Sequence, residues 1–244
     1  MITKEQNKKN ALILCGHGSR DESYLDDFFS LKNRLKKKFQ LISIYHCFIE
    51  INEPSIENCI EKIERNYEKI FFFPLLIFEG KHLIVDITKK LKKISSDHSS
   101  KIFLIDKISL INDILPIIVK IIKNNYPQDF NVLITSCSVS KKKAVKDELK
   151  IYTEKLSYLL EINKHVFHFV GDEGHVSKQV QKMKSTQIKS LLHPVFFFNG
   201  YLYKKNIKEL SETIRTINLK PISHYNEITN LLSKKLIAVF QTLN

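Results

Sequence analysis

Residues 12–21 read LILCGHGSRD, a short apolar run that opens directly into a glycine-rich polar loop with one histidine. A continuous apolar run is typical of a strand buried in a parallel sheet. Three more runs of this kind follow at 41–51, 69–78 and 101–108. The stretches between them carry apolar residues at helical spacing, as at Tyr24, Phe28, Leu31 and Leu35. Strands that alternate with helices in this way predict an α/β fold with a parallel sheet covered on both faces.

The same order of landmarks begins again 120 positions later. Residues 132–141, VLITSCSVSK, fall on residues 12–21 without a gap. The same shift places PVFFFNGYLYKKNI (194–207) on PLLIFEGKHLIVDI (74–87), with the proline and the glycine of each segment in phase. Agreement at separate strand ends is the mark of an internal duplication.

The duplication predicts two tandem units, each a four-stranded parallel sheet flanked by helices. We expect residues 1–126 to carry the active site and residues 127–244 to be a degenerate repeat of the same fold. No apolar run reaches the roughly 18 residues that span a bilayer, and the polar start does not resemble a signal peptide. The four cysteines show no CxxC pairing. We therefore expect a cytoplasmic protein with buried thiols and no membrane partner.

The net charge of +13 does not by itself indicate nucleic-acid binding. Only four of the 39 basic residues are arginine, whereas nucleic-acid binders favour the planar guanidinium. The abundance of Lys, Ile and Asn together suggests a codon bias toward A and T. A solvated basic surface and attraction for a polyanionic small molecule both remain open, but we expect no nucleic-acid partner.

Polar residues follow three of the predicted strands at their carboxyl ends, where open parallel sheets bind ligands. His17 follows the first strand, Glu53 the second, and Glu79 and His82 the third. Loops after the first and third strands can face each other, so His17 and His82 can point at a common centre. Two imidazoles with a carboxylate or water suit Co²⁺, Fe²⁺ or Ni²⁺.

The second repeat is an internal control for these histidines. In the 120-residue register, His17 falls on Cys137 and His82 falls on Leu202. A lone histidine in a loop is usually a surface residue. Its loss from the other copy, while the apolar pattern survives, favours a functional role over a structural one.

Three segments resemble the signature blocks of the sirohydrochlorin chelatases: GHGSRD at 16–21, FIEINEPS at 48–55 and PLLIFEGKHLIVDI at 74–87. These are the CbiX-type class II chelatases, which insert a divalent metal into the tetrapyrrole sirohydrochlorin. The blocks cover the strand ends of the N-terminal half. The C-terminal half resembles the degenerate second repeat of the family's long form.

The resemblance implies a role for each matching residue. His17 is the metal ligand and catalytic proton acceptor, His82 is the second metal ligand, and Glu53 lies at the substrate. The substrate wall comprises Ile77, Phe78, Glu79, Gly80, Lys81 and His82. Lys81 stands where the family often has a small or apolar residue, and Thr88 stands where a proline is common.

By the same resemblance the metal is a substrate rather than a resident cofactor. Co²⁺ for cobalamin synthesis is the first expectation, with Fe²⁺ or Ni²⁺ as alternatives. The chain has no GxxxxGK[ST] stretch, so ATP is not expected to take part. Sirohydrochlorin carries eight carboxylates, which suits Arg20 and the positive net charge. The chain is expected to be a monomer or a homodimer.

Three other functions compete with a cobalt chelatase. The first is a sirohydrochlorin ferrochelatase of sirohaem synthesis, and the second is a carrier that binds metal or tetrapyrrole without turnover. The third is a histidine phosphotransfer enzyme. That chemistry generally needs an arginine beside the nucleophile, whereas Gly16 precedes His17.

Overall fold

The structure is a computed structural model that describes residues 10–78, 87–94, 101–126, 129–140, 142–171, 176, 178, 179, 189–212 and 214–242. The chain divides into two compact units. The N-terminal unit comprises Met1–Ile108 together with Thr229–Asn244, and the C-terminal unit comprises Ser109–Ile228.

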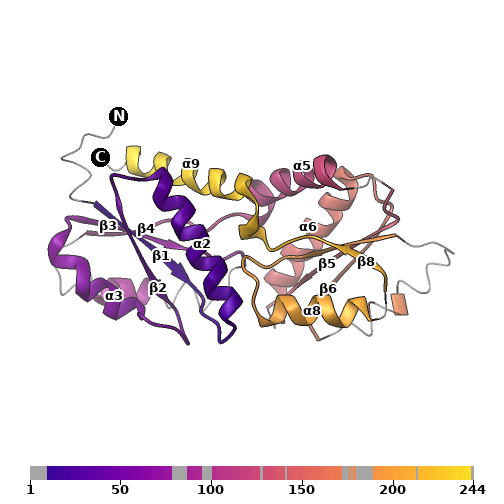
Figure 1. The fold of residues 1–244 in the computed structure, drawn as a ribbon, viewed down its shortest axis with the longest axis horizontal. Helices are drawn as coiled ribbons and strands as arrows, with labels where there is room; N and C mark the ends of the chain where they lie inside the picture. The colour runs from indigo at the N-terminus through magenta and orange to yellow at the C-terminus, as the bar shows by residue number, and fades with distance from the viewer. Residues whose placement is uncertain are drawn as a thin grey trace. The chain divides into compact units, whose positions relative to one another are not determined.

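The N-terminal unit is built on a four-stranded parallel sheet with the strand order β2-β1-β3-β4 (Figure 1). Its strands are β1 (Asn10–Gly16), β2 (Ser43–Phe48), β3 (Lys69–Pro74) and β4 (Lys101–Leu104). Its helices are α2 (Glu22–Lys38), α3 (Ile56–Ile63), helical residues 87–94, the short turn η1 (Glu64–Asn66) and most of α9 (Asn226–Thr242).

Helix α2 forms where the sequence predicts a helix. The side chain of Asp21 accepts a hydrogen bond from the backbone N–H of Ser23, and so satisfies a donor at the helix start. The predicted apolar positions, Tyr24, Phe28, Leu31 and Leu35, are all buried. On the other face of the sheet, α3 and residues 87–94 pack over apolar side chains of β1, β2 and β3. Both faces are therefore covered, as predicted.

The C-terminal unit repeats this plan with the strand order β6-β5-β7-β8. Its strands are β5 (Val132–Cys137), β6 (Lys164–Phe169), β7 (Ser190–Pro194) and β8 (Thr216–Asn218). Its helices are α5 (Leu115–Asn125), which follows the π-helical turn η2 (Leu110–Ile114), α6 (Lys143–Leu159), α8 (Tyr201–Ser211) and the turn η3 (Ile222–His224). Two parallel sheets with the same strand order confirm the predicted fold class and the internal duplication.

The boundary between the compact units differs from the predicted break between residues 126 and 127. Helix α5 contacts α6, so it belongs to the C-terminal unit although it follows β4 in the chain. Helix α9 belongs to the N-terminal unit from Thr229 onward, and the ring centroid of Phe240 lies 4.7 Å from that of Phe71 on β3. The final helix of each repeat thus completes the unit of the other repeat.

The register between the repeats is 121 residues over their first strands, not 120. Helices α2 and α6 start at residues 22 and 143 and end at residues 38 and 159. Ile49 N–H donates to the carbonyl of Gly16, which ends β1, and Val170 N–H donates to the carbonyl of Cys137, which ends β5. Gly16 and Cys137 therefore occupy the same place.

The predicted match of His17 with Cys137 is accordingly wrong by one residue, and His17 corresponds to Ser138. The 120-residue shift does hold at the third strand, where Leu75 N–H donates to the carbonyl of Cys15 and Val195 N–H to that of Ser136. The connection between the second and third strands is one residue shorter in the second repeat. Because strand side chains alternate between faces, a slip of one residue exchanges core and opposite-face positions.

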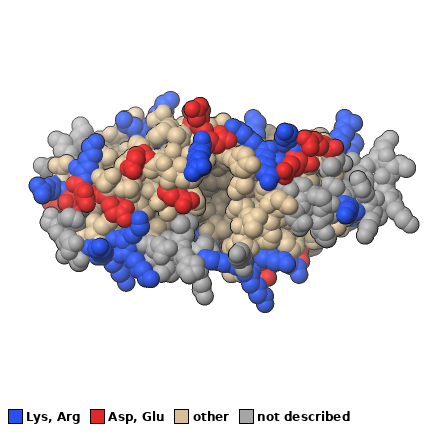
Figure 2. Space-filling view, turned by 90° about the horizontal axis from the view of Figure 1, so that it is seen from below, with Lys and Arg blue, Asp and Glu red and all other residues tan. Residues whose placement is uncertain are grey.

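The predicted buried thiols are confirmed. All four cysteines are free and buried. Lys and Arg side chains are spread over the face in Figure 2, with Asp and Glu among them. Among the residues that the structure describes, no helix is long and apolar enough to cross a membrane.

Candidate functional site at the end of β1

His17 is the first residue after β1, at the carboxyl end of the sheet. Two backbone hydrogen bonds tie its loop to the segment that follows β2. Ile49 N–H donates to the carbonyl of Gly16 at 3.0 Å, and Glu50 N–H donates to the carbonyl of His17 at 3.1 Å. The imidazole remains about half exposed, with 47% of the side chain accessible. The backbone of His17 is therefore fixed while its ring is open to a ligand.

The same pairing brings a carboxylate to the imidazole. Nδ1 of His17 lies 3.2 Å from Oε1 of Glu50. A carboxylate at this distance orients the ring and engages Nδ1, which leaves Nε2 for a metal ion or a proton. Glu50 was not among the predicted site residues. The signal was present, because Glu50 follows β2, and β2 is the neighbour of β1 in the sheet.

Glu53, the predicted carboxylate, has a different set of contacts. Its Oε2 accepts hydrogen bonds from Ser55 N–H at 2.8 Å and from Nδ2 of Asn58 at 3.4 Å. The Ser55 hydroxyl in turn accepts from Asn58 N–H at the start of α3. A carboxylate at a helix N-terminus interacts favourably with the helix dipole. In this structure Glu53 therefore helps to begin α3.

The hydroxyl of Tyr24 holds the backbone of the loop that carries His17. It accepts hydrogen bonds from the backbone N–H groups of His17, at 2.9 Å, and of Gly18, at 3.3 Å. Burial raises the pKa of Tyr24 to about 12, so the phenol stays protonated at neutral pH. Asn52 fixes the far side of the loop, because its Oδ1 accepts from Ser19 N–H at 2.7 Å. Two side chains from outside the loop thus define its shape.

Gly18 lies where the loop that carries His17 comes close to the backbone of Glu50. Its φ of +104° lies in a region that side chains rarely adopt, and a Cβ at this position would sit 1.9 Å from the carbonyl oxygen of Glu50. The absence of a side chain at Gly18 therefore permits the contact between the loops that carry His17 and Glu50.

The predicted substrate wall is described only at its beginning. Ile77 is buried, and its carbonyl accepts a hydrogen bond from Nζ of Lys107 at 3.1 Å. Phe78 is half-buried. Glu79, Gly80, Lys81 and His82 lie outside the described residues, so the predicted pairing of His17 with His82 stays a prediction. Within the described part of the chain, no group of three or more His, Cys, Asp or Glu side chains could hold a metal ion.

The C-terminal unit fills the corresponding strand ends with a buried polar network. The hydroxyl of Ser136 donates to Oδ1 of Asn206 at 2.6 Å, and Nδ2 of Asn206 lies 3.4 Å from Nε2 of His168. All three side chains are buried. Ser138 stands in the place of His17, and His168, the described imidazole in this network, is buried.

The His17–Glu50 pair has the dimensions of two ligands to one ion as well as those of a hydrogen bond. Imidazole and carboxylate ligands of a tetrahedral ion lie about 2.0–2.1 Å from the metal, which puts the two donor atoms about 3.3 Å apart. The observed 3.2 Å therefore needs little change to accommodate a divalent cation between the two side chains. Both residue types suit Fe²⁺, Co²⁺ and Ni²⁺.

Part of the chain matches a known protein family and a curated protein. Residues 11–125 match the model of the CbiX family. A sirohydrochlorin ferrochelatase of Priestia megaterium is 31% identical over 94 residues, which make up 38% of this chain and 35% of that protein. The match thus spans about a third of the length of the curated relative.

Solved structures extend the likeness over both units. SirB from Bacillus subtilis with Fe³⁺ has a TM-score of 0.77 at 18% identity, and the match covers 93% of this chain and 94% of SirB. SirB from B. subtilis subspecies spizizenii in complex with cobalt has a TM-score of 0.73 at 16% identity, with 93% of each chain covered. These likenesses establish the fold, and the match to the CbiX family covers residues 11–125 of it. Residues 11–125 thus resemble the CbiX family, and both units share the fold of the SirB structures.

Proposed function

We propose that this protein inserts a divalent metal ion into sirohydrochlorin at the carboxyl ends of β1 and β2, without ATP. The observation that carries the proposal is the 3.2 Å approach of Nδ1 of His17 to Oε1 of Glu50 within a loop of family-typical sequence. Both side chains are about half exposed, so a metal ion and a flat macrocycle can reach them. The match of residues 11–125 to the CbiX family, with a curated relative that is a sirohydrochlorin ferrochelatase, supports this substrate class.

The reaction needs a ligand set that releases its metal and a base that takes protons. As M²⁺ enters the macrocycle, two pyrrole N–H protons leave, so the balanced products are the metallated tetrapyrrole and two protons. Nε2 of His17 would first hold the ion and then accept one proton, since imidazole exchanges protons near neutral pH. Glu50 would hold the ring through Nδ1 and stabilise the imidazolium that forms. His82 completes the proposed ligand set.

We assign substrate contacts to the positions that resemble the family's substrate wall. These are Glu53, Ile77, Phe78, Glu79, Gly80, Lys81 and His82. Ile77 and Phe78 follow β3, the strand beside β1 on the side opposite β2. Arg20, which is exposed in the loop that begins at His17, is suited to pair with a carboxylate of the substrate.

Co²⁺ is the metal that the long, duplicated form suggests, and Fe²⁺ is the alternative. The relatives include both metals in their names: a ferrochelatase, a SirB with Fe³⁺ and a SirB with cobalt. Imidazole and carboxylate ligands accept either ion, so donor type does not select between them.

An anaerobic assay with sirohydrochlorin and one metal at a time tests the proposal. Absorbance of the tetrapyrrole reports both binding and insertion. Wild type should accelerate insertion of Co²⁺ or Fe²⁺ over the protein-free reaction, and ATP should have no effect. His17→Ala should lose at least about 10²-fold in insertion rate because it removes a ligand and a base, while the tetrapyrrole still binds.

Ser138→Ala is the matched control, since Ser138 occupies the place of His17 in the other repeat. It should insert metal at the wild-type rate. If His17→Ala inserts cobalt, iron and nickel as fast as wild type, the proposed chemistry is wrong. If wild type binds both ligands and never inserts metal, the carrier alternative holds instead.

A further inference from the structure

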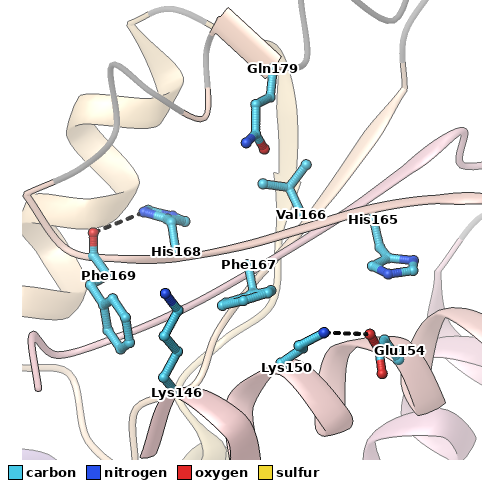
Figure 3. A pocket seen from close by; sticks show the side chains of 9 residues that line it. All are labelled: Lys146, Lys150, Glu154, His165, Val166, Phe167, His168, Phe169 and Gln179. Carbon is cyan, nitrogen blue, oxygen red and sulfur yellow. Dashed lines mark hydrogen bonds and ion pairs between the residues drawn. The ribbon is translucent and has the colours of Figure 1, made fainter. Parts of the chain in front are cut away.

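A hollow of about 360 Å³ runs along β6 in the C-terminal unit (Figure 3). Among the described strands, β6 pairs only with β5, so it forms an edge of the sheet. Residues 165–169 of this strand line the hollow, and α6 forms one wall with Lys146, Lys150 and Glu154. No residue of the loop that carries His17 takes part.

The N-terminal unit fills the same place with side chains. In the 121-residue register, Lys150 stands where α2 has Phe29, and Phe167 stands where β2 has His46. The rings of Phe29 and His46 pack edge to face with their centroids 5.1 Å apart. Nζ of Lys32 also lies 2.8 Å from Nδ1 of His46. The two edges therefore differ in that a phenylalanine ring of α2 packs on the edge strand in one unit, whereas a lysine of α6 takes that place beside the hollow.

Positive charge exceeds negative charge around the hollow. Lys146 and Lys150 are one turn apart on α6 and both line the cavity. Nζ of Lys150 lies 3.8 Å from Oε1 of Glu154, the only carboxylate in the described lining. The ammonium group of Lys146 has no side-chain partner among the described residues. His165 adds an exposed imidazole from the strand.

Two aromatic rings lie beside these cationic groups. Phe167 and Phe169 alternate along β6 with Val166 and His168, so their side chains share the face that packs toward α6. Both are half-buried, which leaves part of each ring exposed to the hollow. In Figure 3 the side chain of Phe167 lies between the strand and the helix that carries Lys146 and Lys150.

We propose that this hollow binds a small aromatic molecule that carries two or more carboxylates. The ring would pack on Phe167, and the carboxylates would pair with Lys146 and Lys150. A volume near 360 Å³ lies at the lower end of the range for small-molecule sites and is too small for a tetrapyrrole. The hollow is therefore a second site, independent of the proposed metal insertion.

Calorimetric titration of the full chain with benzene-1,3,5-tricarboxylate tests the site. Lys146→Gln/Lys150→Gln should weaken binding about tenfold, since two partly exposed ion pairs are lost. The charge-matched control is Lys155→Gln/Lys208→Gln, which removes two exposed lysines of the same unit that do not line the hollow. It should bind as wild type. Equal affinity in wild type and in the Lys146/Lys150 variant, or no heat with wild type, overturns the proposal.

A second comparison tests the aromatic part of the assignment. Propane-1,2,3-tricarboxylate has the same number of carboxylates without a ring, so it should bind wild type more weakly than the aromatic acid. Phe167→Leu should reduce this preference while it retains the lysines. If the two acids bind wild type equally well, the site recognises charge alone and the proposed ligand class is wrong. Metal insertion with sirohydrochlorin, measured on the same variants, keeps this result separate from that of the chelatase assay.

Discussion

Glu50 approaches the catalytic candidate His17 to 3.2 Å, whereas Glu53, three residues later, directs its carboxylate to the start of α3. The two glutamates lie in one segment, FIEINEPS, and differ in what their side chains contact. The carboxylate of Glu50 lies beside the imidazole. The other forms hydrogen bonds that begin a helix.

The first prediction separates these two carboxylates. Glu50→Gln keeps the size of the side chain but removes the charge that orients and stabilises the imidazole. It should lower the rate of metal insertion about 10–100-fold, the usual effect of losing a partner of a metal-binding histidine. Glu53→Gln should have a much smaller effect on the rate. Steady-state assays with sirohydrochlorin measure the insertion rates of both variants. If Glu53→Gln loses more activity than Glu50→Gln, Glu53 is the functional carboxylate.

The sequence was sufficient to predict the architecture because the evidence for it is redundant. Each strand is a continuous apolar run and each helix has its own buried stripe, as in Tyr24, Phe28, Leu31 and Leu35. A second copy of the same order then repeats every signal. The position of His17 at the end of β1 followed from the same pattern.

Contacts that depend on a one-residue difference could not be predicted in this way. The 120-residue alignment matched prolines and glycines of the third strand, yet one residue is missing from the preceding connection, so His17 corresponds to Ser138. Glu50 and Glu53 are both candidates by composition. The 3.2 Å distance from Nδ1 of His17 to Oε1 of Glu50 shows which one lies beside the ring. The apolar pattern of α5 and α9 shows that each helix is packed on one face, but it does not show which unit each helix joins.

The second prediction concerns the phenol beneath the loop. Tyr24→Phe removes the oxygen that accepts from His17 N–H and Gly18 N–H, and leaves both donors without this acceptor. We expect a loss of about 1–3 kcal/mol in the free energy of unfolding. Metal insertion should also slow, because the loop is less well fixed. Urea unfolding measures the first effect, and Tyr158→Phe, at an exposed tyrosine, should change neither quantity.

The third prediction separates steric clash from backbone strain with two glycines. Gly18 and Gly171 have nearly equal φ values of +104° and +105°. A Cβ at Gly18 would meet the carbonyl of Glu50 at 1.9 Å, whereas a Cβ at Gly171 meets no described atom within 4 Å. Gly171→Ala should cost about 1–2 kcal/mol from conformation alone. Gly18→Ala should cost more and should also lower activity, since the segment of Glu50 must move away from His17.

Equal destabilisation by the two alanine substitutions, with activity retained in Gly18→Ala, would show that the two loops do not need this close approach. Thermal unfolding and the insertion assay, run on the same two preparations, give both readings.

The fourth prediction concerns the dependence of stability on pH. His193 is fully buried in the C-terminal unit, and its Nε2 lies 2.9 Å from the hydroxyl of Tyr152. Burial lowers the pKa of His193 from 6.5 to about 3. Between these values the unfolded chain binds a proton that the folded chain does not. The contribution of this residue is therefore complete above about pH 6.5 and is lost as the pH falls toward 3.

From pH 7.5 to pH 5 the loss from His193 should be about 2 kcal/mol. His193→Gln keeps an acceptor for the Tyr152 hydroxyl and does not titrate, so its stability should fall less over the same interval. Urea unfolding at the two pH values gives the difference between wild type and variant. Some slope should remain in the variant, because burial and then Lys32 lower the pKa of His46 in the N-terminal unit to about 4. Parallel pH profiles for wild type and His193→Gln would show that His193 is not the buried neutral imidazole described by its contacts.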